Sequence, residues 1–302
     1  MLRHISPYLQ TMRFFSNTTV KQSHQQSHWT NFFIGGIGDM GGTFYLPYCY
    51  QPEQAFVLML EHYKIALTRD KIRGPMGTSK PLHVKILWDM PEVKAQLACL
   101  LNPPTAEEAY QCYLRIQDEL IENEAQIIPY SKECLQLFKE NRMPFCFTTG
   151  FDSKTTEKLL AKTKQQLLHD YPVISADQVS DRSRPSMVKD ALWKMGIPLT
   201  DVSNVFFITD AKADVSSVRK VFSTICIIAV IDYGTSMGID DPKLVTRMSQ
   251  EELRRRRDMA SLMLSDAGAD ITIPNLGHMP YALAQLTQNR LQSQMGSLKK
   301  GY

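Results

Sequence analysis

The hydrophobic positions of this chain form two kinds of run. Continuous short apolar runs favour buried strands, whereas apolar residues three and four positions apart favour amphipathic helices. The runs that predict strands are Phe32–Ile37, Met143–Thr149, Val173–Ser175, Val205–Thr209, Thr224–Ile231 and Ile271–Ile273. The helical pattern occurs at Gln54–Tyr63, Ser79–Leu87, Glu92–Leu100, Ala106–Glu122, Thr155–Leu168, Met187–Met195 and Val215–Val221. From Met143 onward the two patterns alternate, which indicates a parallel sheet with helices on both faces.

The four helical stretches between the first two strands have no strand among them. We therefore predict an α/β fold in which a Rossmann-like parallel core, residues 31–48 and 127–302, carries an inserted α-helical cap domain at residues 49–126. Near the C-terminus, a capping box at Ser249–Glu252 predicts the start of a further helix, and Gly268 predicts its end.

The composition narrows the class of protein. The chain has 302 residues, 43% of them hydrophobic and 22% charged, which is ordinary for a globular protein. Its net charge is +3, and the basic run Arg254–Arg257 lies in a helical pattern, so we expect no nucleic-acid partner. The six cysteines lack the spacing of a disulfide framework or a structural zinc site, which favours a reducing compartment. No apolar run approaches the roughly 18–20 residues of a membrane span, so we expect a soluble protein with no membrane contact.

The N-terminal segment has a composition of its own. Residues 1–38 contain no acidic residue but carry Arg3, Arg13 and Lys21 among Ser, Thr and Gln, as organellar transit peptides do. The sequence at 13–16, Arg-Phe-Phe-Ser, is also typical of a mitochondrial processing site. These features predict a mitochondrial protein; the alternative is a disordered polar tail on a cytoplasmic one. In either case residues 1–30 lie outside the predicted fold.

Acidic residues follow two of the predicted strands. Asp39 comes after the first apolar run and is followed by Gly41, Gly42 and Thr43, so that backbone N–H groups can approach an anion beside a carboxylate able to attack phosphorus. A simple turn is the alternative reading. Asp210 ends a later strand and Asp214 lies four residues on. With Asp39 they offer hard oxygen ligands for Mg²⁺, at the sheet edge where such folds bind ligands.

Other candidates stand between these acids. Thr149-Gly150 ends a strand with a hydroxyl able to bind a phosphoryl oxygen, and Arg184, fixed before a proline, can neutralise developing charge. Lys80 and His83 share one face of a predicted inserted helix. A lysine with a lowered pKa can form a Schiff base with a carbonyl substrate, although a solvated lysine and a structural histidine are the plainer alternatives.

Taken in this order, the residues resemble the haloacid dehalogenase superfamily and, within it, the phosphonoacetaldehyde hydrolase family. The resemblance extends from about Phe33 to about Leu286. The motif positions that carry it are Asp39 to Thr43, Thr149, Arg184, and the pair Asp210 and Asp214. The family's Pro-Met-Gly-x-x-Lys-x-x-His segment and its cysteine are present as Pro75, Met76, Gly77, Lys80, His83 and Cys49. Gly41 stands where ordinary phosphatases of the superfamily have an Asp that protonates an alkoxide.

The resemblance implies Mg²⁺-dependent hydrolysis of the P–C bond of phosphonoacetaldehyde to acetaldehyde and phosphate. In this scheme Lys80 forms an imine and Asp39 attacks phosphorus. The implied catalytic residues are Asp39, Lys80, His83, Met76 and Cys49. The implied phosphate-binding residues are Thr43, Thr149, Gly150 and Arg184, and the implied metal ligands are Asp39, Gly41, Asp210 and Asp214. The family also implies a homodimer that contacts through the cap. Another hydrolase of the superfamily and a non-catalytic binding protein remain alternatives.

Several positions depart from the family pattern. Glycines at 35, 36 and 38 interrupt the first strand where the family has bulky apolar residues, which predicts a weaker strand. Phe151 replaces an expected tyrosine, and Ser183 and Thr209 replace expected glycines. These changes leave the implied covalent and metal positions intact but surround them, so they bear on substrate identity.

Overall fold

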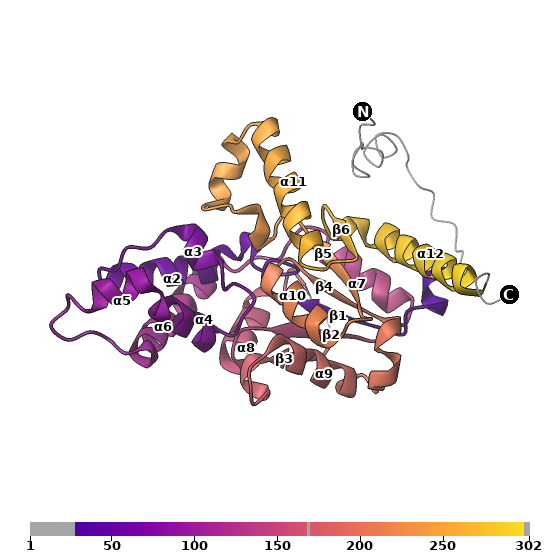
Figure 1. The fold of residues 1–302 in the computed structure, drawn as a ribbon, viewed down its shortest axis with the longest axis horizontal. Coiled ribbons are helices and arrows are strands. Elements are labelled where there is room, and N and C mark those ends of the chain that lie inside the picture. Colours follow the sequence, from indigo (N-terminus) through magenta and orange to yellow (C-terminus); the bar gives the residue numbers. More distant parts are fainter. Residues whose placement is uncertain (1–27, 168–169, 299–302) are drawn as a thin grey trace.

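The computed structural model describes residues 28–167 and 170–298 and contains one six-stranded sheet. All neighbouring strands are parallel, in the order β3-β2-β1-β4-β5-β6 (Figure 1). The strands are β1 Gly35–Asp39, β2 Phe145–Thr149, β3 Val173–Ser175, β4 Val205–Thr209, β5 Cys226–Val230 and β6 Ile271–Ile273. The predicted α/β fold is confirmed, and three predicted strands have the same bounds as in the structure.

The glycines of strand β1 are explained by the aromatic side chains of the neighbouring strands. A Cβ atom on Gly36 would lie 2.3 Å from the Phe206 ring of β4, and one on Gly38 would lie 2.7 Å from the Phe145 ring of β2. The aromatic side chains of the two neighbouring strands therefore fill the space that side chains of β1 would occupy. Every residue of β1 is buried. The glycines thus accommodate large neighbours at the centre of the sheet instead of leaving a gap there.

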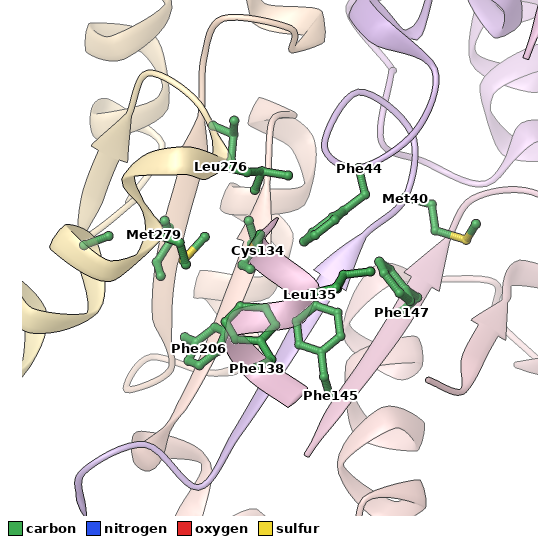
Figure 2. Close-up of a cluster of buried hydrophobic side chains, with 14 of the residues drawn as sticks. Met40, Phe44, Cys134, Leu135, Phe138, Phe145, Phe147, Phe206, Leu276 and Met279 are labelled. Atoms are coloured by element: carbon green, nitrogen blue, oxygen red, sulfur yellow. The ribbon is translucent and has the colours of Figure 1, made fainter. Parts of the chain in front are cut away.

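Helices cover both faces of the sheet. On one face, α7 Ser131–Glu140, α8 Ser153–Thr163 and α12 Met279–Leu298 contribute to an apolar cluster. Figure 2 shows this cluster, with Phe138 of α7 beside Phe145 and Phe206 of the strands. On the other face, α9 Arg184–Lys194, α10 Lys212–Val221 and α11 Gln250–Asp266 pack against the sheet in a second cluster. Two covered faces account for the continuous apolar strands.

The helices that lie between β1 and α7 gather at one end of the molecule (Figure 1). They are α2 Tyr50–His62, α3 Arg69–Arg73, α4 Lys80–Asp89, α5 Pro91–Leu97 and α6 Ala106–Glu124. Their inward side chains form a third apolar cluster, which includes Phe56 and Tyr113. We call residues 50–124 the helical segment. The short helix α3 was not predicted, because five residues give too little periodicity.

The two chain connections to the helical segment run side by side. Leu46 donates its backbone N–H to Gln126 O over 2.9 Å, and Ile128 donates to Phe44 O over 2.9 Å. The first connection also contains three non-glycine residues with left-handed backbone, Leu46, Tyr48 and Cys49. Such conformations cost on the order of 1–3 kcal/mol each and persist only where surrounding contacts hold them.

Short 3₁₀ turns complete the chain. They are η1 His28–Asn31, η2 Pro47–Cys49, η3 Ala176–Gln178, η4 Leu199–Asn204, η5 Thr235–Met237, η6 Pro242–Arg247 and η7 Leu276–His278. Ser249 accepts from Glu252 N over 3.1 Å at the start of α11, as predicted. The Glu252 carboxylate pairs instead with Arg255 and Arg256, so part of the basic run is engaged within its own helix. Within the described residues, no helix combines the length and apolarity needed to cross a membrane.

Candidate active site

The carboxyl ends of β1, β2 and β4 bring three predicted residues to one edge of the sheet. Strand β1 lies between β2 and β4, with Asp39 level with Thr148 and Gly38 level with Ile208. Asp39, Thr149 and Asp210 consequently line one cavity with residues of the helical segment. All three side chains are buried. The predicted convergence of these residues at the sheet edge is therefore what the structure shows.

Arg184 ties the site together from the first turn of α9. Its guanidinium lies 2.8 Å from Asp39 Oδ1 through Nη2 and 2.9 Å from Asp214 Oδ1 through Nε. Its Nη1 donates to Thr148 Oγ1 over 2.9 Å, and its Nη2 donates to Gly77 O over 3.4 Å. One buried cation thus bridges two buried carboxylates and reaches the helical segment.

Ser183, which stands where the family has glycine, has a structural use. It is the N-cap of α9, and its hydroxyl accepts from Ser186 N over 3.3 Å. An N-cap satisfies a backbone N–H that the first turn leaves free. The substitution therefore fixes the start of the helix that presents Arg184.

Asp210 is held by the loops around it. Oδ1 accepts from Thr43 Oγ1 over 2.9 Å, and Oδ2 accepts from Thr235 N over 2.6 Å. Glycines make this close approach possible, because a Cβ atom on Gly42 would lie 2.3 Å from Asp210 Oδ2 and one on Gly234 would lie 2.6 Å from its Cβ. Gly42 also has a φ of +75°, which favours glycine. The structure thus places the hydroxyl of Thr43 on Asp210.

Asp214 lies in the first turn of α10 and has both carboxylate oxygens in hydrogen bonds. Oδ1 accepts from Arg184, and Oδ2 accepts from Thr209 Oγ1 over 3.2 Å. The hydroxyl of Thr209 also accepts from Ala211 N over 3.3 Å. Thr209, another departure from the family pattern, therefore orients Asp214. In this arrangement Asp214 supports Arg184.

The three buried acids share one electrostatic environment. Burial raises the pKa of Asp210 to about 6 and that of Asp214 to about 7. Burial also raises the pKa of Asp39, while the Arg184 guanidinium opposes that rise. Asp39 further raises the pKa of Asp210 by like-charge repulsion. A cation near Asp39 and Asp210 would relieve that repulsion.

The donor set at this edge fits a hard cation in part. Asp39, Asp210 and Gly41 line the cavity together, and two carboxylates with a backbone carbonyl are oxygen donors of the kind that Mg²⁺ accepts. In the described part of the chain, no three His, Cys, Asp or Glu side chains are grouped so as to hold a metal ion. The predicted set of three carboxylates is thus not assembled here, since Asp214 is bonded to Arg184 and Thr209.

The opposite wall of the cavity presents Lys80, the first residue of α4. Its Nζ lies 5.3 Å from the centre of the Phe151 ring and 5.8 Å from that of Phe56. Among the described residues it forms no ion pair within 4 Å. Burial lowers the pKa of Lys80, and the cation is only 6% exposed. Such an amine has the larger neutral fraction that nucleophilic attack on a carbonyl requires. Phe151 supplies a ring face there without a hydroxyl.

His83 lies one helical turn beyond Lys80. Its Nε2 is 2.8 Å from Ile72 O, and its ring stacks on Phe56 at a centroid distance of 3.9 Å. Burial lowers the pKa of His83 well below its usual range. A neutral ring with Nε2–H donating to the carbonyl leaves Nδ1 as an acceptor, and this buried atom has no hydrogen-bond partner among the described residues.

The remaining predicted residues complete the cavity wall. Met76 is buried on the helical segment, and burial raises the pKa of the Cys49 thiol well above its usual range. Thr149 accepts from Phe151 N over 3.2 Å. A Cβ atom on Gly150 would lie 2.9 Å from Thr78 O, so the helical segment sits directly on the end of β2. The cavity itself measures about 20 Å³, room for roughly one water molecule.

Some residues of the site were not predicted from the sequence. They are Phe56, Gly77, Thr148 and Thr235. Thr148 was detectable in principle, since it precedes Thr149 at a strand end. Phe56 and Thr235 belong to an ordinary helix and a short turn, and nothing in their local sequence distinguishes them. Gly77 lay within the family segment but had no assigned contact.

Comparison with known proteins identifies the fold. No family model matches the chain. Phosphonoacetaldehyde hydrolase of Parabacteroides distasonis is 23% identical over 265 residues, which cover 86% of this chain and 98% of that protein. The crystal structure of a phosphonoacetaldehyde hydrolase-like protein from Oleispira antarctica has a TM-score of 0.74 at 20% identity, covering 89% of this chain and 99% of the other. A haloacid dehalogenase-like protein from Agrobacterium tumefaciens has a TM-score of 0.55 at 16% identity, covering 84% of this chain and 99% of its own.

The chain has the fold of the haloacid dehalogenase-like hydrolases. The likeness spans the sheet and the helical segment, because it covers 89% of the chain. The named relatives also correct one prediction. They come from bacteria, which have no mitochondria, so the predicted mitochondrial location is wrong. The basic segment at residues 1–27 on which it rested lies outside the described residues.

Proposed function

We propose that this protein hydrolyses the P–C bond of phosphonoacetaldehyde, giving acetaldehyde and phosphate. The observation that carries the proposal is the buried amine of Lys80 in the same cavity as the Asp39 carboxylate. A carboxylate alone would suit many phosphoryl transfers. A buried amine opposite it adds a means of activating a carbonyl compound, and a substrate with both a phosphonate and an aldehyde uses both ends.

Imine formation provides the electron sink. The ammonium of Lys80 and the aldehyde give a protonated imine and water: the nitrogen bonds to the carbonyl carbon, and the oxygen departs with two protons from the nitrogen. Asp39 then forms a bond to phosphorus as the P–C bond breaks, and the electron pair of that bond moves into the imine to give an enamine. Without this sink the carbon would have to leave as a carbanion.

The second half returns the protein to its starting state. Water attacks phosphorus of the aspartyl-phosphate, which releases phosphate and frees Asp39. The enamine takes a proton at carbon, and a second water hydrolyses the resulting protonated imine to acetaldehyde and the Lys80 ammonium. Arg184, which contacts Asp39 and Thr148, is positioned to hold the phosphonate oxygens near the nucleophile.

We propose Mg²⁺ as the cofactor, held by Asp39, the carbonyl of Gly41 and Asp210. The chemistry that this ion supplies is neutralisation of charge on the phosphonate oxygens. Asp214 acts in this scheme through Arg184, to which it is bonded. We further propose that the helical segment is a cap, since a cavity of about 20 Å³ must open to admit the substrate. The homodimer through this segment stays a prediction.

The second candidate function is hydrolysis of another phosphoryl compound by the same fold. Asp39 and Arg184 alone would support it, without any role for Lys80. Gly41 argues against phosphate monoesters, because it offers no acid to protonate an alkoxide. The test is phosphate release from phosphonoacetaldehyde with Mg²⁺, alongside a panel of phosphate esters. Release from the aldehyde that disappears in Lys80→Arg supports the proposal. Turnover of esters that Lys80→Arg leaves unchanged would favour the second candidate, and no turnover in the whole panel would favour a binding protein.

A further inference from the structure

The hydroxyl of Thr235 is a buried polar group without a partner in the candidate site. Thr235 opens η5, in the loop that follows β5, and is 8% exposed. Its Oγ1 is buried and forms no hydrogen bond of standard geometry within the described residues. A buried hydroxyl left in this state costs about 1–3 kcal/mol unless a ligand or water satisfies it. Thr235 lines the cavity that holds Asp39 and Lys80, so a bound molecule can supply the partner.

The position of Thr235 is fixed by its backbone and not by its side chain. Its N–H donates to Asp210 Oδ2 over 2.6 Å, and the neighbouring Ser236 Oγ donates to Asp210 O over 2.8 Å. Gly234 lets the loop approach Asp210 closely. The loop thus holds Thr235 through its backbone. The hydroxyl lies near the Asp210 carboxylate and the Cys49 thiol and lowers the pKa of both groups, but within the described residues it forms no hydrogen bond of standard geometry, so a bound molecule can engage it.

The surroundings indicate which end of a substrate this hydroxyl meets. Thr235, Cys49 and Lys80 line the same cavity, and both the side chain of Thr235 and the charge of Lys80 lower the pKa of Cys49. Cys49 therefore adjoins both. Arg184 lies on the Asp39 side and serves anionic oxygens. Near Lys80 the cavity wall includes Met76 and Phe151, which donate no strong hydrogen bond.

Two further polar side chains line the cavity beside Lys80 and Thr235: Thr78, whose hydroxyl donates to Pro75 O over 2.8 Å, and Cys49. Burial raises the pKa of its thiol well above the usual range, so the thiol is neutral and a weak donor. During imine formation the carbonyl oxygen of the aldehyde first becomes the hydroxyl of the amine adduct and then leaves as water. Because this oxygen stays uncharged, a neutral hydrogen-bond donor suits it. The hydroxyl of Thr235 has the required chemistry, and it forms no hydrogen bond of standard geometry within the described residues.

We propose that Thr235 binds the carbonyl oxygen of the aldehyde that condenses with Lys80, and so orients that carbonyl for attack by the amine. The inference rests on the proposed function, because it requires the Lys80 adduct. Thr235 transfers no proton in this role: the oxygen leaves as water with two protons from the lysine nitrogen, and the threonine holds that oxygen by a hydrogen bond.

The test compares three variants of the whole protein. Thr235→Val removes the hydroxyl but keeps the shape and the N–H to Asp210, and Thr235→Ser keeps the hydroxyl. Thr287→Val is the matched control, because Thr287 is similarly buried in α12, away from the cavity, and its hydroxyl donates to Leu283 O over 2.8 Å. The measurement is the rate at which phosphonoacetaldehyde and borohydride trap a reduced adduct on Lys80. The Mg²⁺ concentration for half-maximal phosphate release is measured beside it.

We expect Thr235→Val to slow trapping about tenfold, the effect of one hydrogen bond. Thr235→Ser and Thr287→Val should trap at close to the wild-type rate, and the Mg²⁺ requirement should not change. Wild-type trapping rates in Thr235→Val would overturn the assignment. So would a raised Mg²⁺ requirement with unchanged trapping, which would mean that Thr235 acts through Asp210. If Thr235→Val does not fold, Thr235→Ala gives the same comparison. No Lys80 adduct in the wild type would instead refute the proposed function.

Discussion

The two walls of the cavity differ in how their polar groups are satisfied. At the Asp39 wall, buried charges lie in contact with each other, and Arg184 bridges Asp39 and Asp214 at 2.8 and 2.9 Å. At the Lys80 wall, the amine lies over aromatic rings without an ion pair to any described residue, and His83 Nδ1 has no hydrogen-bond partner among those residues. A preorganised charge network suits a phosphoryl group. Unsatisfied groups around a buried amine suit a site completed by its substrate.

This contrast separates what the fold supplies from what the helical segment adds. The Asp39 wall is built at the carboxyl ends of sheet strands, and Lys80 and His83 belong to α4 of the helical segment. The phosphoryl chemistry can therefore be shared by many proteins of this fold. In the proposed function, the choice of a carbonyl substrate depends on how the helical segment sits on the sheet.

The largest effect is expected from Asp39→Asn. The amide keeps the shape but is not a nucleophile, so phosphate release from phosphonoacetaldehyde should fall by about 10⁴-fold or more. Because the Lys80 wall is intact, borohydride should still trap the aldehyde on Lys80. Loss of trapping together with turnover would show that the two walls are not separable.

Lys80→Arg makes the complementary change. Arginine keeps the positive charge but does not form an imine, so phosphonoacetaldehyde turnover should fall by about 10³-fold or more. Binding of inorganic phosphate, measured by calorimetry in the presence of Mg²⁺, should change little because Arg184 and Asp39 are untouched. Substantial remaining turnover would exclude the Schiff base.

Gly150→Ala disturbs the contact between the walls. The added Cβ atom would meet Thr78 O at 2.9 Å and displace the turn that leads into α4. A shift of about 1 Å in a reacting group can cost about 10²-fold, so kcat/KM should fall by about 10- to 100-fold. Gly74→Ala is the control, since its Cβ atom makes only ordinary contacts, at 3.5 Å or more. Equal effects of the two changes would argue against the docked geometry.

Acid should weaken the Asp39 wall first. Burial raises the pKa of Asp210 to about 6 and that of Asp214 to about 7, so both carboxyls take up protons as the pH falls through this range. Mg²⁺ binding and turnover should decline about tenfold per pH unit below about 6.

The stability of the fold should depend on pH in the opposite direction. A raised carboxyl pKa in the folded state favours folding at low pH, and this contribution to stability is lost as the pH rises through 6. Without metal, the melting temperature of Asp210→Asn relative to wild type should therefore increase from pH 5 to pH 8.

The smallest effect is expected from an ion pair at the surface, where the helical segment meets the loop after β5. Arg73 of the helical segment pairs with Asp240, which follows β5, and also with buried Glu53. Asp240→Asn removes one half-exposed ion pair, worth about 1 kcal/mol at most, so KM should rise by no more than about fivefold. The change in KM should disappear at high salt. A larger effect would mean that this pair governs closure of the helical segment on the sheet.

The sequence was sufficient for the sheet because its strands are buried on both faces and read as continuous apolar runs. Asp39 and Asp210 were predictable for the same reason, since strand ends meet at one edge. The partners of these residues were not predictable. Thr148 and Thr235 reach the site through packing between segments far apart in the chain, and the glycines of β1 make sense only beside Phe145 and Phe206. Metal ligation by Asp214 was an inference from spacing, and the structure instead bonds that carboxylate to Arg184.

The most direct measurement is mass spectrometry of wild-type protein treated with phosphonoacetaldehyde and borohydride. The account predicts one reduced adduct, located on Lys80 and absent from Lys80→Arg. An unmodified Lys80, or an adduct on an exposed lysine that Lys80→Arg retains, would contradict it.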